Sequence, residues 1–312
     1  MMSIKGFDAH IESVVRPTTI VEAQRLDKRL GVTLTLATET FQWTGSFKFR
    51  AAYNVASNVP QKMIIAASSG NFGQAMAYAC SLLKKSCTIV MPMTSAKVKV
   101  EAVIEYGGHV DLVDIRVKSR ADRVRELSEQ HPEAYIASAY DDPLVIEGNS
   151  SLGKEIGALD RQLDMVVVPV GGGGLISGVI TGLKESRKNI AVVGAEPLLG
   201  NDAARSLRAG HIVANESEPQ TIADGARTLS LGKHNWEIIE NNLSTIVEVP
   251  EEKIIEATRL LFEFANLKVE PTGALSVAAV LTHSDLFRGR SVCCVISGGN
   301  VDPAIYASML NG

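Results

Sequence analysis

An apolar run that leads directly into a block of glycines is the feature that most constrains the fold of this chain. The residues from Met165 to Val170 are continuously apolar, and Gly171 to Gly174 follow without a break. An uninterrupted apolar run indicates a strand buried on both faces, as in a parallel sheet covered by helices. A helical period follows at 175–185. A strand, a glycine turn and a helix in this order predict an α/β unit whose turn lies at the carboxyl end of the strand.

The glycine run has a direct physical use. Backbone without side chains lets several amide N–H groups converge on an anion, and the start of the next helix adds a positive partial charge. A nucleotide P-loop is excluded, because Leu175-Ile176-Ser177 stands where that motif requires lysine and serine or threonine. The dinucleotide pattern GxGxxG also fails in every register. We expect a different phosphate here, and a structural turn without a ligand is the alternative.

Further strands and helices alternate along the 312 residues. Such alternation predicts parallel sheets joined by crossover helices, and the length favours two lobes, with a boundary near 141–143. The predicted strands are 32–37, 63–67, 87–91, 110–113, 165–170, 190–194, 245–249 and 291–296. The stretch 7–30 is predicted to be helical with an interruption at 16–19. The other predicted helices are 48–55, 73–83, 97–105, 116–130, 175–185, 203–208 and 251–265.

Lys48 is the candidate nucleophile. It stands between Phe47 and Phe49, directly after a Gly-Ser pair. Aromatic neighbours keep water from the ammonium group, and desolvation favours the neutral amine. A neutral lysine amine forms a Schiff base with an aldehyde or ketone. The alternative is a lysine at a helix start that extends its charged end into water.

Two polar turns follow predicted strands. Ser68-Ser69-Gly70-Asn71 comes after the strand at 63–67, where exposed polar groups can bind a carboxylate. Its alternative is an ordinary helix N-cap, which serine and asparagine commonly supply. The last predicted strand ends at Ser297, which begins Ser-Gly-Gly-Asn. An ordinary strand-ending turn is the alternative there.

Glu196, Gly200 and Asp202 form an E-x3-G-x-D spacing just beyond the predicted strand at 190–194. Carboxylates and a backbone carbonyl on one short loop suit a hard cation such as Mg²⁺ or Ca²⁺. In the competing interpretation, Asp202 caps the next helix and Glu196 is merely exposed. A nucleotide-binding oxidoreductase would instead use Glu196 to bind a ribose, but the failed GxGxxG pattern argues against it.

Lys48, the turn at 68–71 and the glycine loop, in this order, resemble the fold-type II pyridoxal-phosphate enzymes, the group of serine/threonine dehydratases and serine racemases. The resemblance spans nearly the whole chain. It implies a two-lobed α/β fold with parallel-rich twisted sheets and helices on both faces. Residues 1–62 and 141–312 would form a large cofactor-binding domain, and residues 63–140 a small substrate-binding domain.

The resemblance also implies how pyridoxal 5′-phosphate is held. Lys48 would carry the cofactor and later act as general base, with Phe47 beside it. The loop Gly171, Gly172, Gly173 and Gly174 would bind the phosphate. Asn71 would bond the 3′ oxygen, and Ser297 would lie near the pyridine nitrogen. The matching loop in serine racemases and related dehydratases carries a divalent cation, which is consistent with the site at Glu196, Gly200 and Asp202.

By the same resemblance, the substrate would contact Ser68, Ser69, Asn71, Phe72, Arg120 and Thr228. Ser69 would face the substrate opposite Lys48 and is the second candidate catalytic residue. Phe72 departs from the family pattern, since many members carry histidine there, and it makes the pocket more apolar. Arg120 would approach the substrate carboxylate, although it lies within a charged helical pattern that equally indicates a surface role. Thr228 would line the pocket mouth.

The activity implied is β-elimination from a small 3-hydroxy amino acid such as L-threonine or L-serine, giving a 2-oxo acid and ammonia. The alternatives within the family are a serine racemase and a dehydratase of 3-hydroxyaspartate or phenylserine. A cofactor-free binding protein on the same scaffold is a third class. Family members are usually dimers, so a homodimer or higher homo-oligomer is expected. Because the chain ends soon after the last site turn, no C-terminal regulatory domain is expected.

Composition argues against several classes of binding partner and of location. A net charge of -4 and an aromatic fraction of 5% argue against nucleic acid. No apolar run approaches the length of a membrane span, and residues 1–27 lack the apolar core of an export signal. The 4 cysteines lack zinc-ligand spacing and are too few for a disulfide scaffold. A cytoplasmic location fits best.

Overall fold

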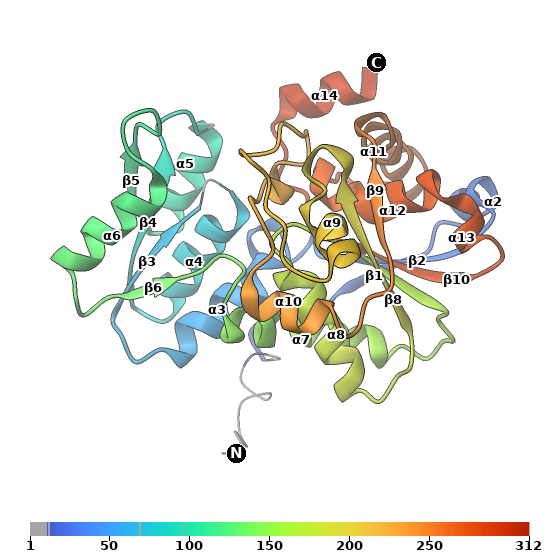
Figure 1. The fold of residues 1–312 in the computed structure, drawn as a ribbon, viewed down its shortest axis with the longest axis horizontal. Coiled ribbons are helices and arrows are strands. Elements are labelled where there is room, and N and C mark those ends of the chain that lie inside the picture. The colour runs from blue at the N-terminus through green and yellow to red at the C-terminus, as the bar shows by residue number, and fades with distance from the viewer. Residues whose placement is uncertain (1–10, 12, 69, 96, 312) are drawn as a thin grey trace.

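The computed structural model describes residues 11, 13–68, 70–95 and 97–311, and its strands form two separate sheets (Figure 1). The larger sheet has six strands in the order β1-β2-β10-β7-β8-β9, and the smaller has four in the order β5-β4-β3-β6. The strands are β1 Thr19–Val21, β2 Thr33–Thr38, β3 Met63–Ala67, β4 Ser86–Pro92, β5 His109–Val113, β6 Tyr135–Ala137, β7 Met165–Pro169, β8 Ala191–Pro197, β9 Ile246–Val249 and β10 Ser291–Ile296.

The helices connect and cover these sheets. Within the described residues, none of them is both long and apolar enough to cross a membrane. The α-helices are α2 Gln24–Leu30, α3 Lys48–Asn58, α4 Asn71–Leu82, α5 Lys97–Glu105, α6 Arg120–Gln130, α7 Pro143–Gly157, α8 Gly174–Glu185, α9 Asp202–Ala209, α10 Lys233–Ile239, α11 Glu251–Ala265, α12 Pro271–Thr282, α13 Ser284–Phe287 and α14 Pro303–Asn311. Short 3₁₀ turns are η1 Trp43–Gly45, η2 Leu198–Gly200 and η3 Asp224–Ala226.

Both sheets are built mainly from parallel strands. Among the strands that the structure describes, all pairs of the smaller sheet are parallel, and in the larger sheet only β1 runs antiparallel, against β2. Parallel neighbours require long crossover connections, and helices such as α4 and α8 supply them. The predicted α/β fold with parallel-rich sheets is therefore confirmed.

The apolar run at β7 is explained by helices on both faces of the larger sheet. Val166 and Val168 join the apolar cluster that includes α8, whereas Met165 and Val167 join the cluster that includes α12. Successive side chains of a strand point to opposite faces, so a strand covered on both sides is apolar throughout. This packing places the glycine turn after β7 at the carboxyl edge of a rigid sheet.

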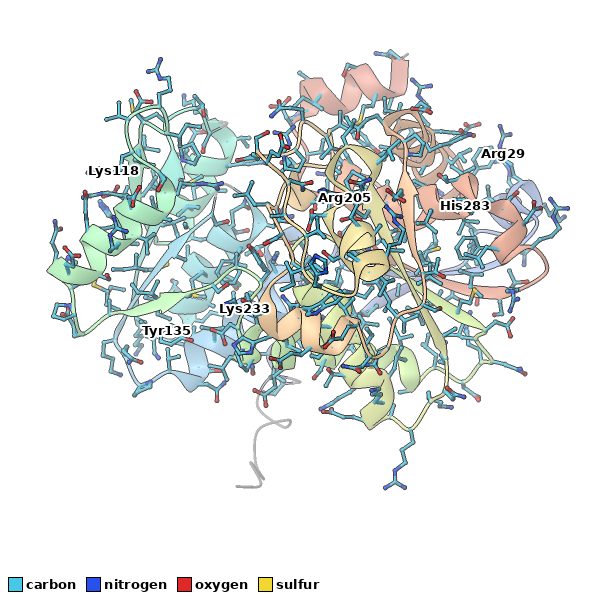
Figure 2. All side chains as sticks on the ribbon, in the orientation of Figure 1. Arg29, Lys118, Tyr135, Arg205, Lys233 and His283 are labelled. Carbon is cyan, nitrogen blue, oxygen red and sulfur yellow. The ribbon has the colours of Figure 1, made fainter. Side chains whose placement is uncertain are left out.

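The helix α3 packs into the core of the smaller sheet. Its residues Phe49, Tyr53 and Val55 share an apolar cluster with α4, β3 and β4. The strands of the smaller sheet all lie within residues 63–140, whereas α3 precedes that range. Tyr135, labelled in Figure 2, donates its hydroxyl to Asp142 Oδ2 over 2.7 Å and so connects β6 to the start of α7. The division at residues 62/63 and 140/141 stays a prediction.

Some predicted bounds need correction. β8 extends to Pro197 by pairing with β9, so Glu196 lies inside the strand and not beyond its end. The helix predicted from residue 116 begins only at Arg120, because the Ser119 side chain accepts the Asp122 N–H and caps that start. The helical prediction for 7–30 is wrong at β1, whose residues pair with β2, and holds at α2. The short strand β6 and the helices α7, α10, α12, α13 and α14 were not predicted.

Candidate active site

A pocket lies where several strand ends of the larger sheet meet the start of α3. The glycine loop follows β7 and Ser297 follows β10, and Lys48 opens α3 beside them. Carboxyl ends of parallel strands share one edge of a sheet, which is why residues far apart in sequence converge here. The pocket is lined by Phe47, Lys48, Tyr140, Pro169, Gly171, Gly172, Gly173, Gly174, Leu175, Gly225, Thr228, Thr272 and Ser297.

The amine of Lys48 is held in a desolvated position. Its Nζ donates to the carbonyl oxygen of Ala139 over 2.8 Å and lies 5.0 Å from the ring centre of Phe47 and 5.8 Å from that of Phe72. Burial lowers the pKa of Lys48 to about 8, and the negative charge of Glu270 opposes that shift. A substantial neutral fraction at pH 8 makes this amine a competent nucleophile and base.

The aromatic environment of Lys48 differs from the sequence argument in one respect. Phe49 does not contribute its ring to the amine, since it packs against Tyr53 and Tyr78 in the smaller-sheet core. Phe72, from α4, takes that place. The histidine-to-phenylalanine departure from the family pattern therefore falls next to the reactive nitrogen and adds to its desolvation.

A buried ion cluster anchors the start of α3. Arg50 is fully buried and donates from Nε to Glu39 Oε2 over 2.8 Å and from Nη1 to Glu155 Oε1 over 2.7 Å. These carboxylates raise the pKa of Arg50 and keep the guanidinium charged, although its burial acts in the opposite direction. The cluster joins α3 to the end of β2 and to α7, so it determines where Lys48 stands.

The glycine loop is held from behind by two buried asparagines. Asn235 Nδ2 donates to the carbonyl oxygen of Gly172 over 2.8 Å, and Asn149 Nδ2 donates to that of Gly174 over 3.0 Å. In a trans peptide the N–H points opposite to the carbonyl. The N–H groups of Gly173 and Leu175 therefore point away from these asparagines and are available to an anion in front of the loop.

Glycine is required at two positions of this loop. A Cβ on Gly172 would lie 2.2 Å from the Tyr140 ring, and Gly173 has φ +94°. Asp141 supports the same region, because its carboxylate accepts the backbone N–H groups of Lys233 and His234 at 3.0 Å each (Lys233 is labelled in Figure 2). Asp141 thereby fixes the start of α10, which carries Asn235.

Asn71 is not among the residues that line the pocket, and it has a partner that sequence reasoning missed. Its Nδ2 donates to Glu270 Oε1 at 2.8 Å and Oε2 at 3.1 Å, and its Oδ1 accepts from Asn300 Nδ2 at 2.8 Å. Glu270 is buried directly before Pro271, the first residue of α12. The sequence signal that pointed to Glu270 was a carboxylate directly before a proline, because proline favours the first position of a helix.

Two hydroxyl groups in the pocket are left for a ligand. Ser297 Oγ and Thr228 Oγ1 are buried and have no hydrogen-bond partner among the described residues. Buried hydroxyls without partners are costly, and a bound molecule would satisfy them. Ser297 and Thr228 thus stand in the predicted pocket.

The turn after β3 is only partly described. Ser68 Oγ accepts the N–H groups of Gly70 at 3.3 Å and Gly73 at 3.0 Å, so this serine caps the start of α4. Ser69 lies outside the described residues. The roles assigned to both in substrate binding stay predictions.

Arg120 stands at the edge of the site. It opens α6, is one-third exposed and pairs with Glu218 over 3.5 Å. It is not among the pocket-lining residues, yet its charge reaches Tyr140, whose pKa is raised by burial and lowered in part by Arg120. Its contact with a substrate carboxylate stays a prediction.

The predicted metal residues gather beside α9. Glu196 is buried, and its oxygens accept the N–H groups of Ala203 at 2.8 Å and Ala204 at 2.9 Å, so the interpretation of an exposed Glu196 is wrong. Asp202 Oδ1 accepts from Asn215 Nδ2 at 2.8 Å. Burial raises the pKa of both carboxyl groups, that of Asp202 to about 6.

A cation near these two carboxylates would offset the cost of burying them together. Across the part of the chain that the structure describes, no cluster of three or more histidine, cysteine, aspartate or glutamate side chains could hold a metal. A cation here would therefore depend on carbonyl oxygens, such as that of Gly200, and on water. The metal site stays a prediction.

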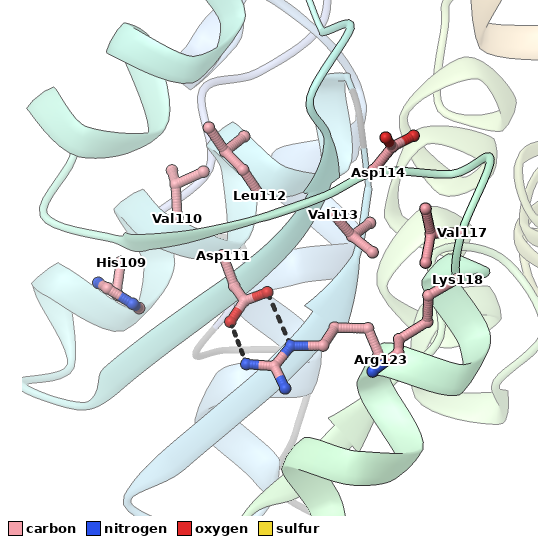
Figure 3. Close-up of a pocket in the computed structure, with 9 residues that line it drawn as sticks. All are labelled: His109, Val110, Asp111, Leu112, Val113, Asp114, Val117, Lys118 and Arg123. Atoms are coloured by element: carbon pink, nitrogen blue, oxygen red, sulfur yellow. Dashed lines mark hydrogen bonds and ion pairs between the residues drawn. The ribbon is translucent and has the colours of Figure 1, made fainter.

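A second hollow, of about 500 Å³, lies beside β5 and α6 (Figure 3). Its charged side chains are already paired. Arg123 donates to Asp111 at 3.0 and 2.7 Å, and Lys118 pairs with Glu126. Paired surface charges and an open shape give this hollow no chemistry comparable to that around Lys48.

The comparisons with known proteins agree with this geometry. The family described as "Pyridoxal-phosphate dependent enzyme" matches residues 11–298. The L-threo-3-hydroxyaspartate ammonia-lyase of Pseudomonas sp is 38% identical over 306 residues, covering 97% of this chain and 95% of that protein. The serine racemase of Schizosaccharomyces pombe is 34% identical, covering 96% and 94%.

A solved structure is equally similar. The threonine deaminase of T.th. superposes with a TM-score of 0.90 at 38% identity, covering 96% of this chain and 99% of that one. Family match, relatives and fold agree along nearly the whole chain. The chain therefore belongs to the pyridoxal-phosphate dependent enzyme family.

Proposed function

We propose that this protein is an ammonia-lyase that removes the β-hydroxyl and the amino group of a small 3-hydroxy amino acid such as L-threonine or L-serine, leaving a 2-oxo acid. The observation that carries the proposal is the amine of Lys48, desolvated and partly neutral, in one pocket with the glycine loop and the unpaired hydroxyl of Ser297. The related ammonia-lyases and threonine deaminase support it.

The residues of the pocket fit the family cofactor. Bound here, pyridoxal phosphate supplies an aldehyde carbon for a lysine amine and a ring that withdraws electrons from the α-carbon of the substrate. The N–H groups of Gly173 and Leu175 and the start of α8 suit its phosphate. Asn71 would donate to its 3′ oxygen, and Ser297 would meet its pyridine nitrogen.

Residues of the chain itself then move the proton and exclude water from the reacting atoms. Lys48 removes the α-proton as general base, and a pKa of about 8 keeps a usable fraction of its amine neutral. Phe47 and Phe72 exclude water from that nitrogen. Ser297 is a neutral hydroxyl, which cannot hold a ring nitrogen protonated as a carboxylate does. This favours prompt loss of the β-hydroxyl over return of a proton to the α-carbon.

Racemisation would require an acid on the face opposite Lys48, and Ser69 is the proposed group. A serine hydroxyl is a weak acid, and Phe72 provides no polar neighbour to activate it. We therefore expect elimination to outrun racemisation. Ser69→Ala should remove any residual racemase activity while elimination of the L-substrate survives in part.

The experiment measures both products from one incubation. Purified holoenzyme is given L-serine or L-threonine, the 2-oxo acid is followed by a coupled dehydrogenase, and the enantiomer by chiral chromatography. Oxo acid should form faster. If the opposite enantiomer appears several-fold faster, the protein is a racemase and the elimination proposal is wrong.

An acidic 3-hydroxy amino acid is the second candidate, favoured by the charge of Arg120 near the pocket residue Tyr140. A β-carboxylate would need such a cation in reach. L-threo-3-hydroxyaspartate, L-threonine and phenylserine should be compared by kcat/KM. A preference for the diacid that Arg120→Gln abolishes, by lowering kcat/KM for the diacid much more than kcat/KM for L-threonine, would establish the second candidate over the first.

We also infer a divalent cation at Glu196, Gly200 and Asp202, a homodimer or higher homo-oligomer, and a cytoplasmic location. The pair of buried carboxylates supports the cation. The resemblance to a family whose members are usually dimers supports the assembly. The cysteines are all free and buried, as a reducing compartment allows. Light scattering measures the assembly directly.

A further inference from the structure

Glu270 is a buried carboxylate beside the pocket, and it has no assigned role in the proposed elimination reaction. It is 3% exposed, and its backbone N–H donates to the carbonyl oxygen of Gly298 at 3.1 Å. Both of its carboxylate oxygens accept from the single Nδ2 of Asn71. Glu270 thus joins α4, from the smaller sheet, to the turn that follows Ser297.

This contact determines which way the Asn71 amide faces. Asn71 Oδ1 accepts from Asn300 Nδ2 at 2.8 Å, and Asn300 Nδ2 also donates to the carbonyl oxygen of Thr44 at 2.7 Å. Turning the amide over would place Asn71 Oδ1 against the Glu270 carboxylate and two N–H groups against each other. Because both exchanges are unfavourable, the nitrogen of Asn71 stays on the Glu270 side as a donor.

Glu270 also acts on Lys48 through its charge. The carboxylate favours the ammonium form of Lys48 and opposes the effect of burial on that amine. The other charged groups that act on Glu270 are Asp224 and Lys99, which pair with each other across the two lobes. Burial, with a contribution from Asp224, raises the pKa of Glu270 to about 7, while the bond from Asn71 and the charge of Lys99 lower it.

We infer that Glu270 is a positioning residue, which fixes the Asn71 amide as a donor for the cofactor's 3′ oxygen and provides a negative charge that acts on Lys48. The inference rests on the proposed roles of Asn71 and Lys48. No atom of Glu270 needs to touch the substrate, because it acts through these two side chains.

The first experiment uses Glu270→Gln holoenzyme, which keeps the size of the side chain and removes its charge. Loss of a nearby negative charge lowers the pKa of the Lys48 amine, which is free as a base only in the enzyme–substrate complex. The acidic limb of kcat against pH should therefore move to lower pH by about one unit. The visible absorbance of the bound cofactor, followed from pH 5 to 10, reports the ionisation of the Lys48–cofactor linkage, on which the same charge acts, and it does so independently of turnover. Profiles that coincide with wild type would overturn the charge role.

The second experiment is a double-mutant cycle on the affinity for pyridoxal phosphate, with Asn71→Ala and Glu270→Gln singly and together. A hydrogen bond to a charged group predicts that Glu270→Gln weakens binding about tenfold in the wild-type background. In the Asn71→Ala background it should weaken binding clearly less, because the group that Glu270 orients is gone and only the charge acting on Lys48 remains. Additive losses would overturn the orienting role.

Two variants keep the result interpretable. Asn300→Ala frees Asn71 Oδ1 without touching the carboxylate, and should repeat the non-additive pattern with Asn71→Ala if Glu270→Gln does not fold. Asp164→Asn is the control, since Asp164 accepts the Ser291 N–H over 2.8 Å at the opposite end of β7. It should change neither profile nor affinity. If the wild type shows no elimination but the effects of Asn71→Ala and Glu270→Gln on cofactor affinity are non-additive, the proposed function fails and the role of Glu270 stands.

Discussion

The amine of Lys48 donates to the carbonyl oxygen of Ala139 across 2.8 Å, although 91 residues separate them in sequence. The next residue, Tyr140, packs its ring over Gly172, and its carbonyl oxygen accepts from Asn235 Nδ2 at 3.0 Å. One short segment between β6 and α7 therefore connects the reactive amine to the glycine loop. Displacement of this segment should affect both halves of the site together.

Lys48 should carry the cofactor covalently. Borohydride treatment of the holoenzyme followed by peptide mass mapping is expected to place a pyridoxyl group on Lys48, because no other described lysine lines the pocket. Lys48→Ala should lower kcat at least about a thousandfold, since it removes both nucleophile and base. Label on another lysine would refute the assignment.

Asn235→Ala should weaken the affinity for pyridoxal phosphate about tenfold, because the carbonyl of Gly172 loses one of its two donors and keeps only the Gly232 N–H at 3.0 Å. At saturating cofactor, kcat should stay near wild type. Titration of the apoenzyme and the ³¹P NMR shift of the bound phosphate measure the two effects. Asn241→Ala is the control, since Asn241 only bonds the Glu237 carbonyl on the exposed side of α10.

The cofactor-free protein should become more stable as pH rises from about 8 to 10.5. The pKa of Lys48 is depressed to about 8, so in this window the unfolded chain binds more protons than the folded one, and the free energy of unfolding increases with pH. Below pH 8, the free energy of unfolding of Lys48→Met should exceed that of the wild type by about 3.4 kcal/mol. Urea unfolding of both proteins across this range should show the gap closing. A pH-independent gap would contradict the depressed pKa.

Chelation should lower the melting temperature if Glu196, Gly200 and Asp202 hold a cation, and Mg²⁺ or Ca²⁺ should restore it by mass action. Asp202→Asn should abolish that response, because one of the two buried carboxylates is gone. Asp285→Asn, at a side chain that is 91% exposed, serves as the matched control. A melting temperature that ignores chelator in the wild type would leave Glu196 as a helix cap only.

Arg50→Met should destabilise the fold by about 3 to 5 kcal/mol, because it leaves the buried Glu39 carboxylate without its cation. Arg116→Met should leave the free energy of unfolding close to that of the wild type, since Arg116 pairs with Asp114 at the surface, where solvent screens the pair. Chemical unfolding of both variants measures the difference. Equal effects would mean that the buried cluster does not anchor α3.

The sequence by itself determined the strand, turn and helix around Gly171 to Gly174 and singled out Lys48. These features are local: a strand covered on both faces must be apolar, and a backbone with φ +94° at Gly173 or a ring beside Gly172 requires glycine. Each of these requirements can therefore be recognised from the residue types at the positions concerned. The parallel-rich α/β fold followed from the same periodicities.

Only the tertiary structure decided which side chains complete the site. Phe72 and not Phe49 approaches the Lys48 amine, Asn235 holds the glycine loop, and Glu270 meets Asn71 across 199 residues of sequence. Periodicity states which face of an element is buried, but it does not state which distant element lies against that face. Which elements lie against each other depends on how the two sheets and their helices pack together. The protonation of Lys48 depends on the same packing.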